Sequence, residues 1–279
     1  MASKSLVIGG TGGIGYAIAC RIAANTPSST VIISGRNEPK NIPHSNIQFR
    51  ALDASSMRAI KSYTDELKAS QDRFSTLVLT QGILTTAGRT ETSEGIDRKM
   101  ALHYYGRQLL IRELMPALTE DAKVLIVLDS LRGGPDTMKW DDLDLKSNFT
   151  LANAAAHCMS MNDAMIQYHG TEQKLAGNKR QFFHAMPGIV RTNIGSSLPW
   201  YLRGPASVLS VVLGASPEKC AENLLNGVEK AAASGEKEGK HWGFINEKGG
   251  VFEKPDWDEE KVKKVKEHTW DLVDGVLKA

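Results

Sequence analysis

The chain alternates short apolar runs with longer stretches of helical periodicity. The runs fall at 5–10, 31–35, 46–53, 75–82, 123–130 and 180–188, and the main helical stretches at 14–24, 56–69, 92–115 and 151–173. Continuous apolar runs are typical of parallel strands that are buried on both faces. Right-handed crossovers place the intervening helices on both sides of such a sheet. We therefore predict an α/β fold over residues 1–279, a single domain with a doubly wound parallel sheet in three αβα layers.

Composition excludes several other classes of protein. The 34 basic and 32 acidic residues nearly cancel, so the chain has no overall field that would favour nucleic acid or an anionic membrane. The three cysteines, Cys20, Cys158 and Cys220, form no CxxC pair, which argues against disulfides and a metal site. The N-terminal residues lead directly into the first apolar run, without the pattern of a signal peptide or transmembrane segment. We expect a cytoplasmic protein that binds a small molecule.

A glycine-rich segment, IGGTGGIGYAIA at 8–19, connects the first predicted strand to the first helix. Its glycines at 9, 13 and 15 allow a tight turn, close approach of a ligand to the backbone, and close packing of helix on sheet. The turn directs free N–H groups toward one point, where a pyrophosphate can bind. We predict that residues 1–130 form the nucleotide-binding half. The alternative, a glycine loop without a ligand, is less consistent with the flanking strand and helix.

The second predicted strand ends at Arg36, where a cofactor with a free ribose 2′-hydroxyl would call for an acidic residue. A guanidinium suits a 2′-phosphate, so the sequence favours NADP(H) over NAD(H). The alternative is a surface arginine without a ligand. Asp53, after the third strand, is a candidate acceptor for the adenine amino group, or a turn-forming aspartate.

Several further motifs resemble the short-chain dehydrogenase/reductase family over about residues 4–195. They are LDA at 52–54, TQGI at 80–83 where the family usually has Asn-Asn-Ala-Gly, LDS at 128–130 and MPGIVRT at 186–192. The segment KWDDLDLKS at 139–147 is similar to an insertion of retinol-dehydrogenase-like members, and the sequence as a whole resembles fungal-type members of the family. The resemblance implies a Rossmann-like fold. It also implies a cofactor-binding set of Gly9, Thr11, Gly12, Gly13, Ile14, Gly15, Arg36, Asp53, Ala54, Gly82, Pro187, Gly188 and Thr192.

Family members usually carry a catalytic set of Asn, Ser, Tyr and Lys, and only Ser130 matches it. The resemblance places His157 at the tyrosine, Met161 at the lysine and His103 at the asparagine. No tyrosine of the chain is followed four residues later by a lysine. Since histidine has an ordinary pKa of about 6.5, it can exchange protons near neutrality without a lysine beside it. We therefore expect His157 to be the general acid, with Ser130 and His103 assisting.

Each of these residues also has a structural interpretation. His157 can be a polar remnant in a pocket that has lost its chemistry, with Met161 filling the space of the lysine. His103 can be a packed, hydrogen-bonded histidine beside Tyr104, and Ser130 can belong to the turn that follows its strand.

The last third of the chain begins with an apolar segment, LPWYLRGPASVLSVVLGA at 198–215. We predict a substrate lid at 196–216, the alternatives being a peripheral membrane contact or a dimer surface. Helices should follow at 217–232 and at the C-terminus. By analogy with the family, a homo-oligomer would form through the helices at 92–115 and 151–173.

Three functions fit these patterns. The first is an NADP(H)-dependent reductase of a small apolar carbonyl or enone, of the secondary-metabolite type, with His157 in place of the tyrosine. The second is a redox-neutral cyclase or isomerase of natural-product biosynthesis, favoured by the loss of three of the four usual residues. The third is a non-catalytic NADP(H) sensor. The complete nucleotide motif favours the first, by family analogy more than by site chemistry.

Overall fold

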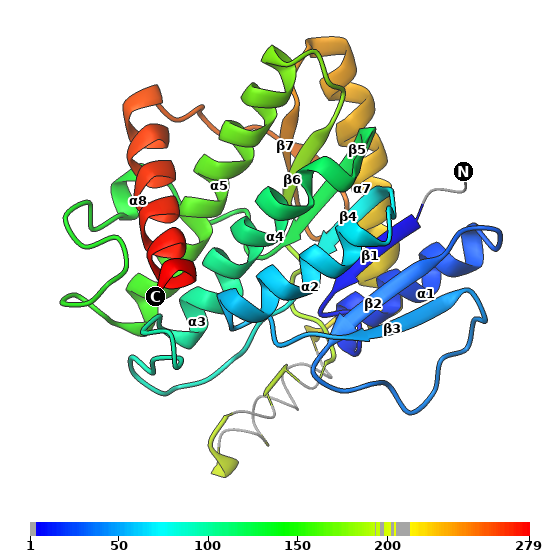
Figure 1. Cartoon of the computed structure of the whole chain (residues 1–279), viewed down its shortest axis with the longest axis horizontal. Helices are drawn as coiled ribbons and strands as arrows, with labels where there is room; N and C mark the ends of the chain where they lie inside the picture. The colour runs from blue at the N-terminus through cyan, green and yellow to red at the C-terminus, as the bar shows by residue number, and fades with distance from the viewer. Residues whose placement is uncertain (1–3, 193, 196–197, 202–203, 205–212) are drawn as a thin grey trace.

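A computed structural model of the chain describes residues 4–192, 194–195, 198–201, 204 and 213–279. Its centre is an eight-stranded sheet in the order β3-β2-β1-β4-β5-β6-β7-β8 (Figure 1). All neighbouring strands are parallel except β7 and β8. The strands are β1 (Lys4–Ile8), β2 (Val31–Gly35), β3 (Ile47–Ala51), β4 (Phe74–Leu79), β5 (Leu118–Val127), β6 (Gln181–Ala185), β7 (Trp242–Ile245) and β8 (Val251–Phe252). The predicted α/β sheet of a single domain is confirmed.

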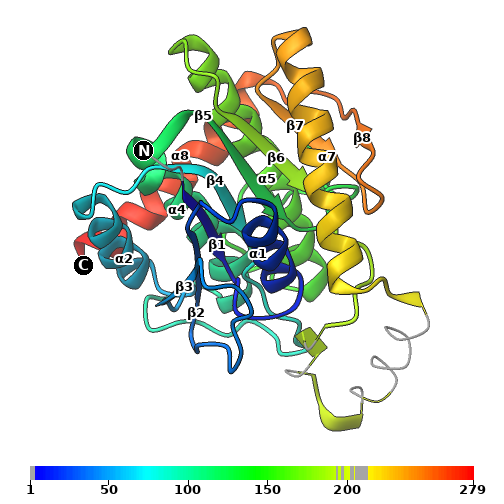
Figure 2. The same cartoon turned by 90° about the vertical axis from the view of Figure 1, so that its right-hand side faces the viewer.

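Helices cover both faces of this sheet, as Figure 2 shows. Two of them, α1 (Gly13–Asn25) and α7 (Pro217–Glu238), pack together on one face. The other face carries α2 (Met57–Ala69), α4 (Gly106–Leu114), α5 (Leu151–Leu175) and α8 (Glu259–Lys278). Successive side chains of a strand point to opposite faces. On β1, Leu6 and Ile8 therefore belong to the core under α2, α4 and α5, while Val7 belongs to the core under α1 and α7.

The predicted helix at 92–115 is shorter and less regular than its sequence suggested. Asp97 caps its beginning, because its carboxylate accepts hydrogen bonds from the N–H groups of Lys99 and Met100. The helix then runs through α3 (Arg98–Met100), one π-helical turn η1 (Ala101–Tyr105) and α4, and ends in the 3-10 turn η2 (Met115–Ala117). Such π turns are frequent at functional sites. This one carries His103.

The insertion before α5 contains the short 3-10 turn η3 (Pro135–Thr137) and no longer helix or strand. Asp142 organises its second half by accepting hydrogen bonds from the backbone N–H groups of residues 146, 147 and 148. Most of the predicted lid at 196–216 lies outside the described residues. Its C-terminal base is described, and there the backbone of Ala215 bonds to that of Ile189 and Arg191.

The C-terminal helix α8 covers the helices through which the family analogy predicted an oligomer. Tyr104 and Tyr105 are fully buried, and their hydroxyls bond to Thr269 at 2.5 Å and to His268 at 2.8 Å on α8. Arg112 of α4 forms an ion pair with Asp274 at 2.8 Å and lies over the ring of Trp270. The chain's own helix thus occupies a surface that a second copy would need.

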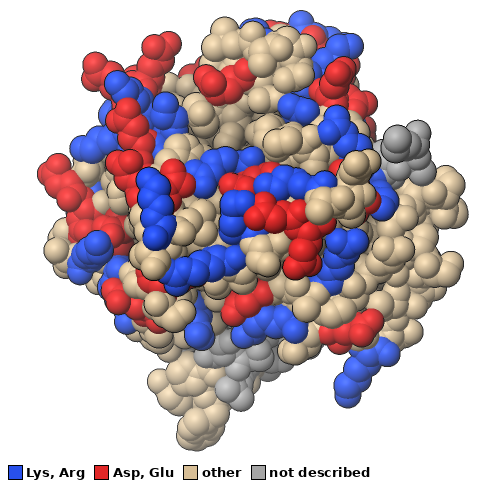
Figure 3. Space-filling model, viewed as in Figure 1, with Lys and Arg blue, Asp and Glu red and all other residues tan. Residues whose placement is uncertain are grey.

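The outer face of this helical layer carries charges of both signs, interspersed over the area seen in Figure 3. Many are paired, as Lys68 is with Glu113 at 2.8 Å. No large field of one sign develops on this face. Within the described residues, no helix has the length and apolar character needed to span a membrane.

We predict that the full chain is a monomer because α8 shields Tyr104 and Tyr105. Light scattering coupled to size exclusion should give the mass of one chain. Removal of residues 259–279 should expose the two tyrosines and produce self-association. The variant Lys263→Ala, on the exposed face of α8, serves as the control and should leave the mass unchanged. A dimer formed by the intact chain and kept by the truncated one would show that α8 does not control assembly.

Candidate nucleotide-binding site

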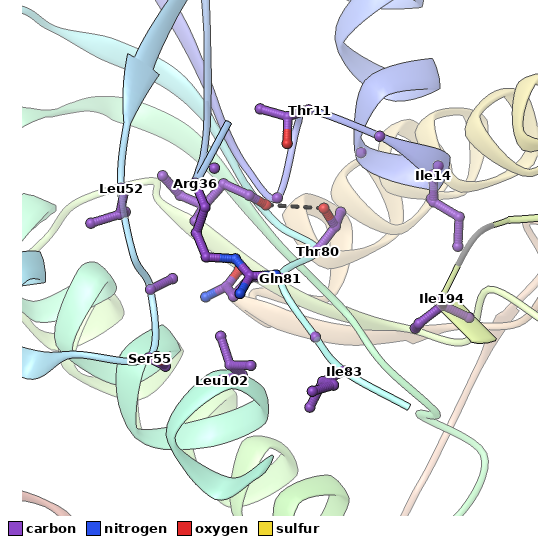
Figure 4. A pocket seen from close by; sticks show the side chains of 18 of the residues that line it. Thr11, Ile14, Arg36, Leu52, Ser55, Thr80, Gln81, Ile83, Leu102 and Ile194 are labelled. Carbon is purple, nitrogen blue, oxygen red and sulfur yellow. Dashed lines mark hydrogen bonds between the residues drawn. The ribbon is translucent and has the colours of Figure 1, made fainter. Parts of the chain in front are cut away.

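A cavity of about 390 Å³ lies at the carboxyl ends of β1, β2, β3 and β4 (Figure 4). It is lined by nearly all residues of the predicted cofactor set, namely Gly9, Thr11, Gly12, Gly13, Ile14, Gly15, Arg36, Asp53, Ala54, Gly82 and Thr192. These residues come from distant parts of the chain. They meet because parallel strands end at the same edge of the sheet, and the strand order changes direction between β1 and β4.

Two glycines of the turn after β1 cannot be replaced without a collision. Gly9 has a φ of +79°, and a Cβ there would lie 2.6 Å from the backbone nitrogen of Gln81. A Cβ on Gly15 would lie 2.5 Å from the carbonyl oxygen of Gly9. The first glycine makes the turn and the second lets α1 approach the strands, as the sequence predicted.

The beginning of α1 is available to an anion. Its N-cap is Gly12, which has no side chain to accept from the first N–H groups, and the first turn contains no acidic residue. Unpaired N–H groups and the helix dipole create a positive potential at this point. The cavity contains Gly12, Gly13 and Ile14 among its walls, so this potential acts inside the cavity.

Two guanidinium groups and one carboxylate mark the other end of the cavity. Arg36 follows β2, Asp53 follows β3, and Arg98 begins α3. Burial acts to raise the pKa of Asp53, but hydrogen bonds from Ser55 and the two nearby arginines hold it below its ordinary value. Asp53 is therefore ionised at neutral pH. The sequence analysis did not select Arg98, because nothing in its local pattern distinguished it from a surface residue.

The floor of the cavity is fixed by a buried arginine that the sequence analysis also missed. Arg107 on α4 is 1% exposed and donates to the carbonyl oxygens of Gln81 at 2.7 Å and Val127 at 2.9 Å. Burial lowers its pKa to about 10, so it remains charged at neutral pH. The guanidinium thereby joins the ends of β4 and β5.

Pro187 and Gly188 do not line this cavity, unlike the rest of the predicted cofactor set. The Pro187 carbonyl accepts from the Cys220 thiol at 3.5 Å. Gly188 has a φ of +71°, and a Cβ there would lie 3.0 Å from Cβ of Glu247. Both residues belong to the turn after β6, and their cofactor role stays a prediction.

The three predicted catalytic side chains are all bonded to backbone groups. The imidazole Nε2 of His103 accepts from the N–H of Ile83 at 2.9 Å, and burial lowers its pKa to about 3. The hydroxyl of Ser130 is fully buried and donates to the carbonyl of Ile245 at 2.9 Å. None of the three residues is among those that line the cavity. His103 nevertheless lies beside it, because a Cβ on Gly82 would be 2.9 Å from its Nε2.

His157 connects α5 to the insertion before it. Its Nε2 accepts from the N–H of Lys139 at 2.8 Å and its Nδ1 donates to the carbonyl of Leu143 at 3.2 Å. The residue is fully buried, and this burial lowers its pKa. Both ring nitrogens are thus used, and the imidazole is neutral with its proton on Nδ1. To act as an acid from Nε2, His157 would have to give up its bond to Lys139.

A lysine that the sequence analysis did not consider lies next to Ser130. The ammonium of Lys254, between β8 and α8, donates to the Ser130 carbonyl at 3.2 Å and the Arg132 carbonyl at 3.3 Å, and it is paired with Asp163. The other oxygen of Asp163 accepts from Nδ1 of His184 at 2.6 Å. All three hydrogens of the ammonium have acceptors, so Lys254 fixes the turn after β5 to α5.

No group of three or more histidine, cysteine or carboxylate side chains able to hold a metal ion occurs within the described part of the chain. The cavity is lined by backbone N–H groups, two guanidinium groups, amide and hydroxyl side chains and the carboxylate of Asp53. This composition suits a ligand with phosphate groups.

The fold is similar to those of several proteins of known structure. A short-chain dehydrogenase family protein of Francisella tularensis matches with a TM-score of 0.61 at 18% identity, covering 90% of this chain and 98% of that one. The fold is that of the short-chain dehydrogenase/reductases. A Burkholderia multivorans protein assigned to the same class, with bound NADP in its structure, matches with a TM-score of 0.60 at 14% identity, covering 92% and 100% of the two chains. The resemblance predicted from the sequence is confirmed.

A sequence relative also exists among curated proteins. An oxidoreductase of Emericella nidulans, AN1596, is 32% identical over 200 residues, which is 68% of this chain and 59% of that protein. The match thus spans about three fifths of the relative's length. No family model matches the sequence.

The two residues that the sequence analysis aligned with the family's tyrosine and lysine make structural contacts in this chain. Met161, at the lysine position, is fully buried in the core under α5 and α8. His157, one helical turn earlier, bonds the insertion. These contacts account for the two residue types without requiring catalysis, although the catalytic role of His157 is not tested by them.

We predict that His157→Phe lowers the free energy of unfolding by about 2–4 kcal/mol, since it leaves the Lys139 N–H and the Leu143 carbonyl without partners. Urea denaturation followed by circular dichroism measures this change. The variant His44→Phe, in the partly exposed loop before β3, is the control and should change stability little. If His157→Phe left the free energy of unfolding unchanged, the two observed bonds would not stabilise the fold, and a catalytic role for His157 would be favoured.

Proposed function

We propose that this chain binds NADP(H) in the cavity at the carboxyl ends of β1–β4. The observation that carries the proposal is the cavity itself, where the uncapped start of α1 and the turn at Gly9 face Arg36 and Asp53. The pyrophosphate would be held by the N–H groups around Gly13, with Thr192 against that turn. The Thr192 side chain lies close to this turn, since a Cβ built on Gly13 would be 3.1 Å from Cγ2 of Thr192. The bound NADP of the Burkholderia relative in fold supports this cofactor.

Arg36 would bind the 2′-phosphate of the adenosine ribose. Arg36 is exposed after β2 and lines the cavity, so its guanidinium is hydrated in the free protein and available to bind a phosphate. Arg98 lines the same end and adds a second positive charge. Asp53 is ionised between them and would accept from the adenine amino group. The two arginines suit the ribose phosphate, and the carboxylate of Asp53 suits the adenine base beside it.

The reaction that we propose is reduction of a small apolar carbonyl or enone. NADPH supplies a hydride when it is bound. Ile194 lines the cavity, and Ile189, Trp200 and Leu213 are exposed in or beside the 196–216 segment. They would give the substrate an apolar environment. The oxidoreductase of Emericella nidulans supports this class of activity.

The proton in such a reduction has to come from a group near Ser130. His157 can provide it only after its Nε2 leaves the Lys139 N–H, which requires movement of the insertion. His103 has a pKa of about 3 and is neutral at physiological pH, so it would accept a proton poorly. We therefore expect turnover to be slow.

A second function, nucleotide binding without turnover, has one specific observation in its favour. Ser130, His103 and His157 are all bonded to backbone groups, and none is presented to the cavity. A sensor of NADP(H) would need only the cavity, and the three side chains could remain bonded to the backbone. The two functions differ in whether reduced cofactor is consumed.

The cofactor assignment is tested by Arg36→Glu. NADPH affinity, measured by fluorescence titration, should fall by about 10- to 100-fold because a charge-assisted bond to phosphate is lost and replaced by repulsion. NADH affinity should change little. Arg132→Glu makes the same charge change on an 80% exposed side chain outside the cavity and is the control. If the affinities for NADPH and NADH fell equally, or if neither changed, Arg36 would not be the residue that binds the 2′-phosphate.

The reaction is tested by incubation with apolar aldehydes, ketones and enones while the absorbance of reduced nicotinamide is followed. Slow consumption of NADPH is expected, and the Arg36→Glu variant should show the same maximal rate at saturating NADPH with a raised KM. Tight binding without consumption on any substrate would favour the sensor. Failure of the wild-type chain to bind NADPH would contradict both functions.

A further inference from the structure

One polar side chain at the cavity has no partner. Gln81 follows β4 and is 6% exposed, and neither its amide nitrogen nor its amide oxygen has a hydrogen-bond partner among the described residues. The loss of both bonds destabilises the free protein, since buried amides are almost always paired. A ligand that paired with this amide would recover that loss.

The backbone of Gln81 is held so that its side chain stays at the cavity. Arg107 donates to the Gln81 carbonyl at 2.7 Å, and the backbone nitrogen of Gln81 lies close to Gly9 in the turn after β1. Figure 4 shows the side chain between Thr80 and Leu102, with the Arg36 side chain extending toward it from β2. Arg36 is exposed, whereas the backbone of Gln81 is fixed by the bond from Arg107.

The surroundings of this amide suit a planar base. Leu52, Ala54 and Leu102 offer apolar walls, and Asp53 and Arg98 lie at the rim. An amide presents one donor and one acceptor side by side. Adenine presents its 6-amino donor next to the N7 acceptor, and glutamine pairs with this edge through two bonds. Hypoxanthine presents two acceptors there. When Gly82 is aligned with the glycine of the family's Asn-Asn-Ala-Gly, Gln81 falls at the alanine, so the amide is a feature of this chain.

We propose that Gln81 pairs with the adenine base of the dinucleotide and makes this chain selective for adenine. The proposal rests on the proposed binding of NADP(H). It assigns the two arginines to the phosphate and the glutamine to the base, with both groups in one cavity.

The test compares NADPH with its hypoxanthine analogue, in which an oxygen acceptor replaces the amino donor. Fluorescence titration of the wild-type chain should give at least about fivefold tighter binding of NADPH, as expected for a two-bond contact to a base. Gln81→Met keeps the side-chain length and removes both polar atoms. It should weaken NADPH binding by up to about that factor and reduce the preference, leaving only the part that Asp53 contributes through the adenine amino group. Gln48→Met, at an exposed position on β3, is the matched control.

Two further readouts separate the base contact from a structural role. Reduced nicotinamide mononucleotide, which lacks the adenosine half, should bind wild type and Gln81→Met equally. The melting temperature of Gln81→Met should not fall, because no bond within the protein is lost. A lower melting temperature, tighter NADPH binding by the variant, or equal weakening of NADPH and its analogue would each overturn the proposal.

The outcome for the proposed function is read from the wild-type chain alone. If it binds neither NADPH nor adenosine 2′,5′-bisphosphate, the nucleotide site itself is wrong. If it binds both and Gln81→Met leaves the preference for adenine intact, only the role of Gln81 is wrong.

Discussion

The buried guanidinium of Arg107 holds together the part of the sheet on which the site depends. Parallel strands that end at one edge leave carbonyl groups without partners there, as β4 and its neighbour β5 do. Arg107 donates to the carbonyl of Gln81 after β4, to that of Val127 at the end of β5 and, at 3.3 Å, to that of Leu102 in the π turn. A charge in this position is costly to bury, and the three carbonyl dipoles offset part of that cost. The same bonds fix Gln81 at the cavity floor.

The polar groups near the ends of β5 and β6 are engaged in structural contacts. His157 bonds the insertion before α5, and Met161 is buried in the core. The cation beside Ser130 is Lys254, far along the chain, and its charge is balanced by the buried carboxylate of Asp163. The cavity at the ends of β1–β4 contains none of these groups. The open cavity and the bonded polar groups therefore depend on different strands.

Much of the fold was predictable from the sequence, and the errors have local causes. The first six strands and most helices lie where periodicity placed them, since burial on both faces leaves a continuous apolar run. The helix expected from residue 92 begins at Arg98, because the Asp97 carboxylate caps it there. At the site, the glycine turn, Arg36 and Asp53 meet as predicted. Gln81 could have been noticed as a departure from the family alanine, whereas Arg98, Arg107 and Lys254 gave no local signal.

The sequence by itself determined the doubly wound sheet and the position of the nucleotide cavity, because both follow from periodicity and from a short motif in which neighbours in the chain are neighbours in space. Only the tertiary structure decided what the histidines contact, which cation lies beside Ser130 and which surface α8 covers. Those contacts join residues far apart in the chain, as Tyr104 and Thr269 are at a separation of 165 positions. A hydrogen bond between such residues depends on the packing of the whole chain, and no local pattern encodes it.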